Sequence, residues 1–332
     1  MPTLLCHHTH TTDSNRAERD VRGHTNGTHQ ADYVSMVGAA PPNLDVIFTR
    51  TEHWRADPGR FDRLAERVSE RGGATERFES HAVFTVAGSR GAVINGIETS
   101  VETDDSHVTV CGLPIEHRPP ARACSLDELC DLGREAAWVA PAHPRFPTLG
   151  FSDPRLRRLL DRLDREPFAV ALGYTTGYPA PLNALARGRH TAHPIGEYAR
   201  EYGVPLLPEL DWHAALPRTP TGFGVVDDEA FAALADGRIP VAELLDARRL
   251  KTGRWPAGVK WADFVQTFPG AVPAPLRSFS GGAVPSEDRL RALRDRTIGE
   301  LFAHPFWEGF RVPPDSPASR RTDPADRSGI DG

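Results

Sequence analysis

Short apolar runs alternate with longer amphipathic stretches over most of the chain. The runs predict strands, and stretches in which apolar residues recur every three or four positions predict helices. In residues 58–71, for example, Phe61, Leu64 and Val68 share one face, and two glycines follow. The expected strands span 4–6, 45–49, 81–86, 91–97, 108–110, 138–140, 168–172 and 204–207, and the expected helices span 58–71, 125–137, 153–165, 195–202 and 228–235.

This alternation predicts an α/β fold with a mostly parallel sheet. About seven strands over about 220 residues suit a closed barrel better than an open sheet, although the pattern fits both. We assign the barrel to residues 1–240 and a helical extension to 241–312, with helices at 241–250 and 286–303. Residues 313–332 are polar and rich in proline, which predicts a disordered tail.

Composition and charge exclude several classes of protein. The 332 residues include 39 Lys+Arg and 45 Asp+Glu, a net charge of −6, whereas nucleic acids and anionic membranes require a basic surface. No run approaches the roughly 20 apolar residues of a membrane span, and no apolar signal-peptide core is present. The four cysteines form no CxxC pair. We expect a cytoplasmic protein without a membrane or stable nucleic-acid partner, and its oligomeric state is not predicted.

Histidine is abundant, with 14 residues, and His7, His8 and His10 fall within the first ten positions. On an extended segment, residues i and i+2 point the same way. His8 and His10 can therefore face one metal ion, and His7 is expected on the opposite side of the strand.

Other residues of the kinds that ligate metals follow the later predicted strands. Functional groups of α/β barrels collect at the carboxyl ends of the strands. Imidazoles and carboxylates gathered there need a cation to organise them. The sequence therefore predicts a metal site built from His8, His10, His53, Glu98, His107, His143, Asp211 and His213.

Six short motifs occur in an order that resembles the PHP (polymerase and histidinol phosphatase) domain family of metal-dependent phosphoesterases. The resemblance covers about residues 1–240. Its motifs are His8-Thr9-His10-Thr11 with Ser14, Thr51-Glu52-His53, Asn95-Gly96-Ile97-Glu98, Ser106-His107 ahead of 110–113, Ala142-His143-Pro144 and Asp211-Trp212-His213.

The resemblance implies a distorted (β/α)7 TIM-like barrel with two or three divalent metal ions, Mn, Zn or Fe. It implies one ion on His8, His10, Glu98 and Asp211, a second on Glu98, His107 and His143, and a third served by His53 and His213. Glu98 would bridge the first two ions. Two ions fit better than three, because Cys6-His7 replaces an acidic residue and Asn15-Arg16 replaces a ligand that Asp13, His24 or His29 would have to supply.

The resulting prediction is a phosphoesterase that hydrolyses a small phosphomonoester or a nucleotide-type phosphodiester with a metal-activated hydroxide. Glu98, Asp211 and Arg145 are the expected catalytic residues, with Arg145 as a phosphate clamp preferred over Arg16 and Arg50. Two alternatives stay open: an amidohydrolase-type hydrolase and a non-catalytic PHP-like metal-binding domain. The first is disfavoured because no lysine precedes Lys251 to form a carbamylated bridge.

Overall fold

The protein is described by a computed structural model that covers residues 3–10, 33–41, 44–52, 59–117, 123–146, 150–175, 184, 187–188, 193–212, 224–246 and 248–249. The expected helix at 286–303, the expected tail at 313–332 and most of the expected extension lie outside these residues.

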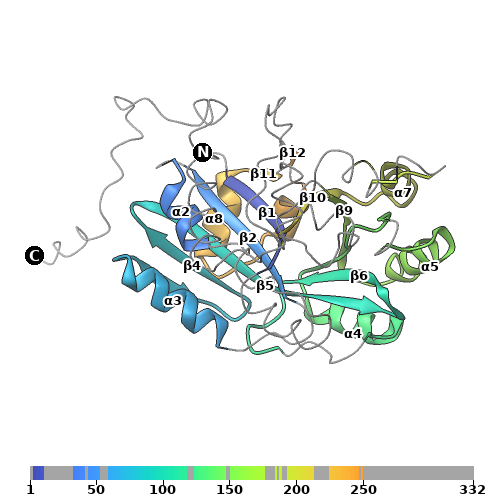
Figure 1. Ribbon diagram of the computed structural model, residues 1–332, viewed down its shortest axis with the longest axis horizontal. Coiled ribbons are helices and arrows are strands. Elements are labelled where there is room, and N and C mark those ends of the chain that lie inside the picture. The colour runs from blue at the N-terminus through green and yellow to red at the C-terminus, as the bar shows by residue number, and fades with distance from the viewer. Residues whose placement is uncertain are drawn as a thin grey trace, which may run out of the picture.

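Eight strands form a nearly closed, barrel-shaped sheet (Figure 1). They are β1 (Thr3–Thr9), β2 (Asp45–Glu52), β5 (Ser89–Val101), β6 (Thr103–Cys111), β7 (Trp138–Pro141), β8 (Ala169–Val170), β9 (Leu172–Thr175) and β10 (Leu206–Trp212). The pairs β1–β2, β2–β5, β7–β8, β9–β10 and β10–β1 are parallel. β6 runs antiparallel to both β5 and β7, so one reversed strand interrupts an otherwise parallel barrel.

Four further strands extend this sheet. β3 (Ala74–Arg77) and β4 (His81–Val86) form an antiparallel ribbon on β5. The β4–β5 turn is Ala87-Gly88, and both residues have positive φ, 51° and 79°, as a two-residue hairpin turn requires. β11 (Gly224–Val226) and β12 (Arg248–Arg249) add an antiparallel pair beside β1.

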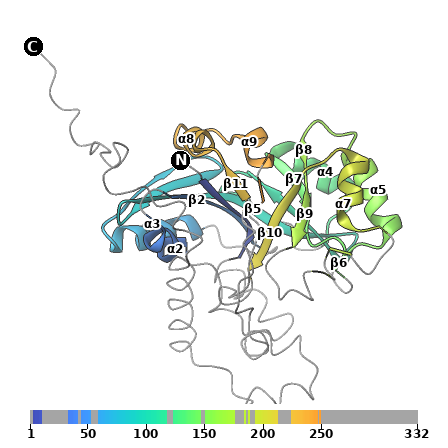
Figure 2. The ribbon, with the colours of Figure 1, turned by 90° about the horizontal axis from the view of Figure 1, so that it is seen from above.

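Helices cover the outside of the barrel in two groups (Figures 1 and 2). α2 (Tyr33–Ala39) and α3 (Arg60–Glu70) lie at one end of the long axis, and α4 (Leu126–Glu135), α5 (Asp153–Leu163) and α7 (Ile195–Tyr202) lie at the other. Each group has its own apolar core against the outer face of the sheet. Among the described residues, no helix has the length and apolar character needed to cross a bilayer.

A third apolar core fills the inside of the barrel, and α8 (Asp228–Ala235) closes its amino-terminal end. Phe231 and Leu234 pack with Leu5 and Ile47 from the beginnings of β1 and β2. The His81 ring nitrogen Nε2 donates a hydrogen bond to the Leu234 carbonyl at 2.8 Å. In Figure 2, α8 lies at the opposite end from the arrowhead of β10, so the carboxyl ends of the strands are the end left for chemistry.

Most predicted elements are present in the structure, and an α/β fold with a barrel-shaped sheet is confirmed. The predicted bounds of α7 and α8 match the structure, and Ser125 with Glu128 forms the capping box that begins α4. The expected helix at 241–250 is wrong in its second half. α9 (Val241–Leu245) ends early, because the chain then pairs with β11 as β12.

Candidate metal centre

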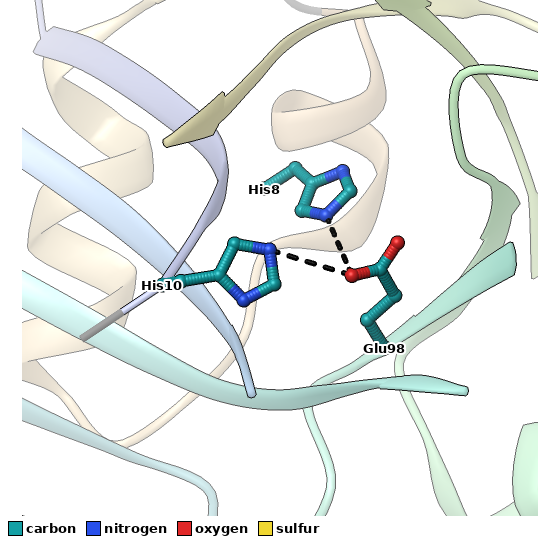
Figure 3. A group of neighbouring side chains, drawn as sticks. All are labelled: His8, His10 and Glu98. Carbon is teal, nitrogen blue, oxygen red and sulfur yellow. Dashed lines mark ion pairs between the residues drawn. The ribbon is translucent and has the colours of Figure 1, made fainter. Parts of the chain in front are cut away.

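A bulge in β1 places two successive histidines on the inner side of the barrel. The pairing register of β1 shifts between His7 and Thr9 against β10 and between Cys6 and Thr9 against β2, and His8 has φ 59°. A bulge adds one residue without a partner and so reverses the alternation of side chains. The Thr9 hydroxyl accordingly faces outward to Tyr33 of α2, 2.7 Å away, whereas the His8 and His10 rings both face Glu98 (Figure 3).

The expectation that His7 points away from His8 is wrong for the same reason. Nδ1 of His7 lies 2.8 Å from the Thr49 hydroxyl, which also accepts the His8 backbone N–H at 2.9 Å. The His7 ring centroid lies 6.2 Å from that of Trp138 in the barrel interior. Burial, with a smaller contribution from His8, lowers the pKa of His7 to about 3. His7 is therefore a neutral ring packed among inward-facing residues.

Glu98 is the centre of the site. Its Oε2 atom lies 3.3 Å from Nε2 of His8 and 3.4 Å from Nε2 of His10, as Figure 3 shows. Its Oε1 atom lies 2.9 Å from Nδ1 of His107 and 3.3 Å from Nε2 of His143. Each oxygen of one carboxylate thus faces its own pair of imidazoles. Within each of the two triads, the ligand atoms lie within 4.8 Å of one another.

The reversed direction of β6 explains how His107 reaches the site. Ser100 near the end of β5 pairs with His107 in the middle of β6. An antiparallel strand starts at the end of the barrel where its neighbour finishes. His107 therefore lies near the carboxyl end of β5, although it does not follow a parallel strand.

His143 arrives by a different route. It lies two residues after the end of β7, with φ 30°. A non-glycine residue with positive φ is strained and is retained where the surrounding structure fixes it. His8 and His143 therefore both hold unusual backbone conformations, one on each side of Glu98.

The centre is dry. His8 and His10 are fully buried, and Glu98, His143 and His107 are 1%, 3% and 8% exposed. Glu98, even with the buried carboxylate of Glu209 beside His8, cannot balance four imidazolium charges in such an interior. Neutral imidazoles that share divalent cations with the carboxylate resolve the conflict, and a His/carboxylate donor set is one that Zn, Mn and Fe accept. The described residues therefore fit two cation positions.

Glu209 was not identified as a site residue by the sequence analysis. This fully buried residue of β10 contacts Nδ1 of His8 through Oε1. Its Oε2 accepts the His143 backbone N–H at 2.8 Å and the Thr175 hydroxyl at 3.4 Å. The missed signal was spacing, since Glu209 and Asp211 are related as i and i+2, like His8 and His10.

The predicted arginine clamps have other partners. Nη1 of Arg145 pairs with Asp153 at the start of α5 and also donates to the Phe151 carbonyl at 3.3 Å. Arg145 thus holds the segment between β7 and α5, and among the described residues no contact with Glu98 is found. Nε of Arg50 donates to Glu52 at 2.7 Å, and both side chains are buried.

For several predicted ligands the structure describes no side chain. His53, His213, Arg16 and the third-metal substitutes Asp13, His24 and His29 lie outside the described residues. For Asp211 only the backbone is described, as part of β10 beside β1 and β9. The structure therefore brings together His8, His10, Glu98, His107 and His143 from the predicted set of eight.

A scan against models of protein families and a search of curated proteins found no match to this chain. The resemblance to the PHP domain therefore rests on the six sequence motifs alone.

Proposed function

We propose that the protein is a metal-dependent phosphoesterase of the PHP type, with Glu98 as the bridge between two divalent cations. One observation carries the proposal: each oxygen of Glu98 faces a separate pair of imidazoles, with separations of 2.9 to 3.4 Å. A carboxylate placed this way suits a two-metal site, whereas a single structural ion needs one compact set of ligands.

The residues divide between the two cations. His8, His10 and Oε2 of Glu98 would hold the first, with Asp211 added from the sequence motif. Oε1 of Glu98, His107 and His143 would hold the second. A bound pair of divalent cations supplies charge neutralisation for a phosphoester and an acidified water as the nucleophile.

The protein's own groups account for the rest of the chemistry. Glu98 would contribute the negative charge that holds two cations at one place, and the buried imidazoles would complete their ligand sets. Exclusion of water around these side chains strengthens each electrostatic contact with the substrate. The substrate class is a small phosphomonoester or a nucleotide-type phosphodiester and not a nucleic-acid polymer, since a net charge of −6 lacks the basic surface that a polymer requires.

Arg145 has a modified role in this proposal. Its pairing with Asp153 makes it a holder of the segment that carries His143. Direct clamping of a phosphate would require this pair to separate. His53 and His213 stay assigned to a third cation through their motifs alone.

The test is a hydrolysis panel on the protein loaded with Mn²⁺ or Zn²⁺ and on the same protein after treatment with a chelator. The panel contains p-nitrophenyl phosphate, bis-p-nitrophenyl phosphate and a p-nitrophenyl carboxylate ester. Metal-dependent cleavage of a phosphoester supports the proposal. Cleavage of the carboxylate ester alone supports an amidohydrolase-type enzyme, and tight metal binding without any hydrolysis supports a non-catalytic domain.

A further inference from the structure

Glu209 lies next to the candidate metal centre and contacts one residue of each of its two triads. Its Oε1 contacts His8, which belongs to the triad on Oε2 of Glu98. Its Oε2 accepts the backbone N–H of His143, which belongs to the triad on Oε1 of Glu98, at 2.8 Å. Glu98 belongs to both triads, and Glu209 contacts one histidine of each triad, His8 and His143.

The contact with His8 determines which ring nitrogen is available. A carboxylate beside Nδ1 keeps the proton of a neutral imidazole on that nitrogen. Nε2 of His8 then directs a lone pair toward Glu98, 3.3 Å away. Two acceptors that face each other require a cation between them, so the contact with Glu209 prepares His8 as a ligand.

The contact with His143 acts on the backbone. His143 has φ 30° and His8 has φ 59°, conformations that need support from the surrounding structure. The same carboxylate supports both residues. The Glu209 carboxylate fits there because residue 173 is a glycine. A Cβ atom on Gly173 would lie 2.6 Å from Oε2 of Glu209 and 2.9 Å from the Pro141 carbonyl oxygen.

We infer that Glu209 is a positioning residue that orients His8 and His143 together and so couples the loading of the two cation positions. The inference rests on the proposed two-metal function. It assigns Glu209 no contact with the substrate. Loss of such an outer partner of a metal-bound histidine typically lowers metal affinity about 10–100-fold.

The variant Glu209→Gln tests this inference because an amide keeps the shape but has a single acceptor oxygen. One of the two N–H groups, on His8 or on His143, must then face an NH₂ group. We expect the affinity for Zn²⁺, measured by competition with a chromophoric chelator, to fall about 10–100-fold at both positions. The absorption bands of the Co²⁺-loaded protein should also shift, which a loss of stability alone would not cause.

Asp45→Asn is the matched control. Asp45 is also a buried carboxylate, but it pairs with Arg90 near the beginning of β2. Its replacement should lower thermal stability and leave Zn²⁺ affinity and the Co²⁺ spectrum unchanged. Gly173→Ala is the second test variant if Glu209→Gln does not fold, because it displaces the Glu209 carboxylate without removing a charge or a ligand.

The outcomes separate the inference from the proposed function. Two Zn²⁺ ions in the wild type, bound as tightly and with the same Co²⁺ spectrum in Glu209→Gln, overturn the inference alone. The same result for Gly173→Ala overturns it if that variant has to be used. A wild-type protein that binds no Zn²⁺ overturns the proposed function, and the inference with it.

Discussion

His8 and Glu98 come from separate strands of the barrel, and Nε2 of the histidine lies 3.3 Å from Oε2 of the carboxylate. Both side chains are buried, with exposed fractions of 0% and 1%. The contact depends on the bulge in β1, which turns His8 inward directly after the inward-facing His7. A local irregularity of one strand thus determines which ring meets the central carboxylate.

The two halves of the centre should be separable by mutation. His107→Asn removes an imidazole from the Oε1 side of Glu98 and leaves the His8–His10 side intact. We expect the metal content, measured by elemental analysis, to fall from two ions per chain to one. His193→Asn is the matched control, since His193 is half exposed and pairs with Glu197 outside the site. Two ions retained in His107→Asn would contradict the division into two positions.

His81 predicts a pH dependence of folding stability that is independent of the metal centre. Burial lowers the pKa of His81 from its ordinary value of 6.5, while the Leu234 carbonyl partly opposes this shift. Below pH 6.5 the unfolded chain therefore binds a proton that the folded protein does not. The contribution of His81 to the free energy of unfolding is fully present above pH 6.5, and it is lost as the pH drops toward the lowered pKa.

The variant His81→Gln checks this sign. Glutamine keeps a donor for Leu234 and does not titrate. Urea unfolding of metal-free protein should show a shallower loss of stability below pH 6.5 than in the wild type, by at most about 1.4 kcal/mol per pH unit. Identical pH profiles for both proteins would show that His81 is not held neutral.

The four cysteines should be inert in the native protein. Cys6, Cys111, Cys124 and Cys130 are buried and form no disulfide. Burial raises the pKa of Cys130 to about 11 and raises that of Cys6 as well, so almost no thiolate exists at neutral pH. A thiol reagent such as Ellman's reagent should label four thiols only after denaturation. Rapid labelling of the native protein would contradict this packing.

The amino-terminal cap of α4 gives a prediction about stability alone. Glu128 N–H donates to the Ser125 hydroxyl at 3.3 Å, and Ser125 N–H donates to the Glu128 carboxylate at 2.8 Å. Ser125→Ala removes one of these bonds and should lower the free energy of unfolding by about 1 kcal/mol. Metal content should not change. A variant as stable as the wild type in urea would show that the cap contributes nothing.

The sequence pattern predicts elements well where local signals agree. The cap of α4 and the bounds of α7 and α8 follow from capping residues and apolar spacing. The pairing of β4 with β5 was also predicted, but its turn was expected at 88–91 and lies at Ala87-Gly88, because β5 already begins at Ser89. The short helix α2 was missed, because an apolar segment of seven residues has no polar face to reveal its period.

The predicted strands are too short where they enter the site. β1 continues through His7 and His8 to Thr9, and β5 continues through Glu98 to Val101. The polar site residues end the apolar run in the sequence, although in the fold they are buried around one carboxylate. Because the predicted strands 91–97 and 108–110 were too short, the sequence left a long gap between them and the direction of β6 was not predicted. Only Glu102 separates β5 from β6, and one residue permits only an antiparallel return.

The family resemblance implied both the members of the centre and their division into two groups that share Glu98, and the structure has the same two groups among the described residues. The motifs do not show which features of the fold direct His8 and His10 to one oxygen of Glu98 and His107 and His143 to the other. That arrangement depends on the bulge, on the reversed strand and on Glu209, which are features of three-dimensional packing.

The most direct test is the metal content and phosphoesterase activity of Glu98→Gln. The variant keeps the shape of the side chain and removes the charge that would hold two cations together. Glu102→Gln is the matched control, because Glu102 is an exposed residue just beyond β5 that pairs with Arg158.

We predict two ions per chain and metal-dependent hydrolysis for the wild type and for Glu102→Gln. For Glu98→Gln we predict a loss of metal and a fall in hydrolysis of several orders of magnitude. Equal metal content and equal hydrolysis in Glu98→Gln and the wild type would contradict a metal centre bridged by Glu98.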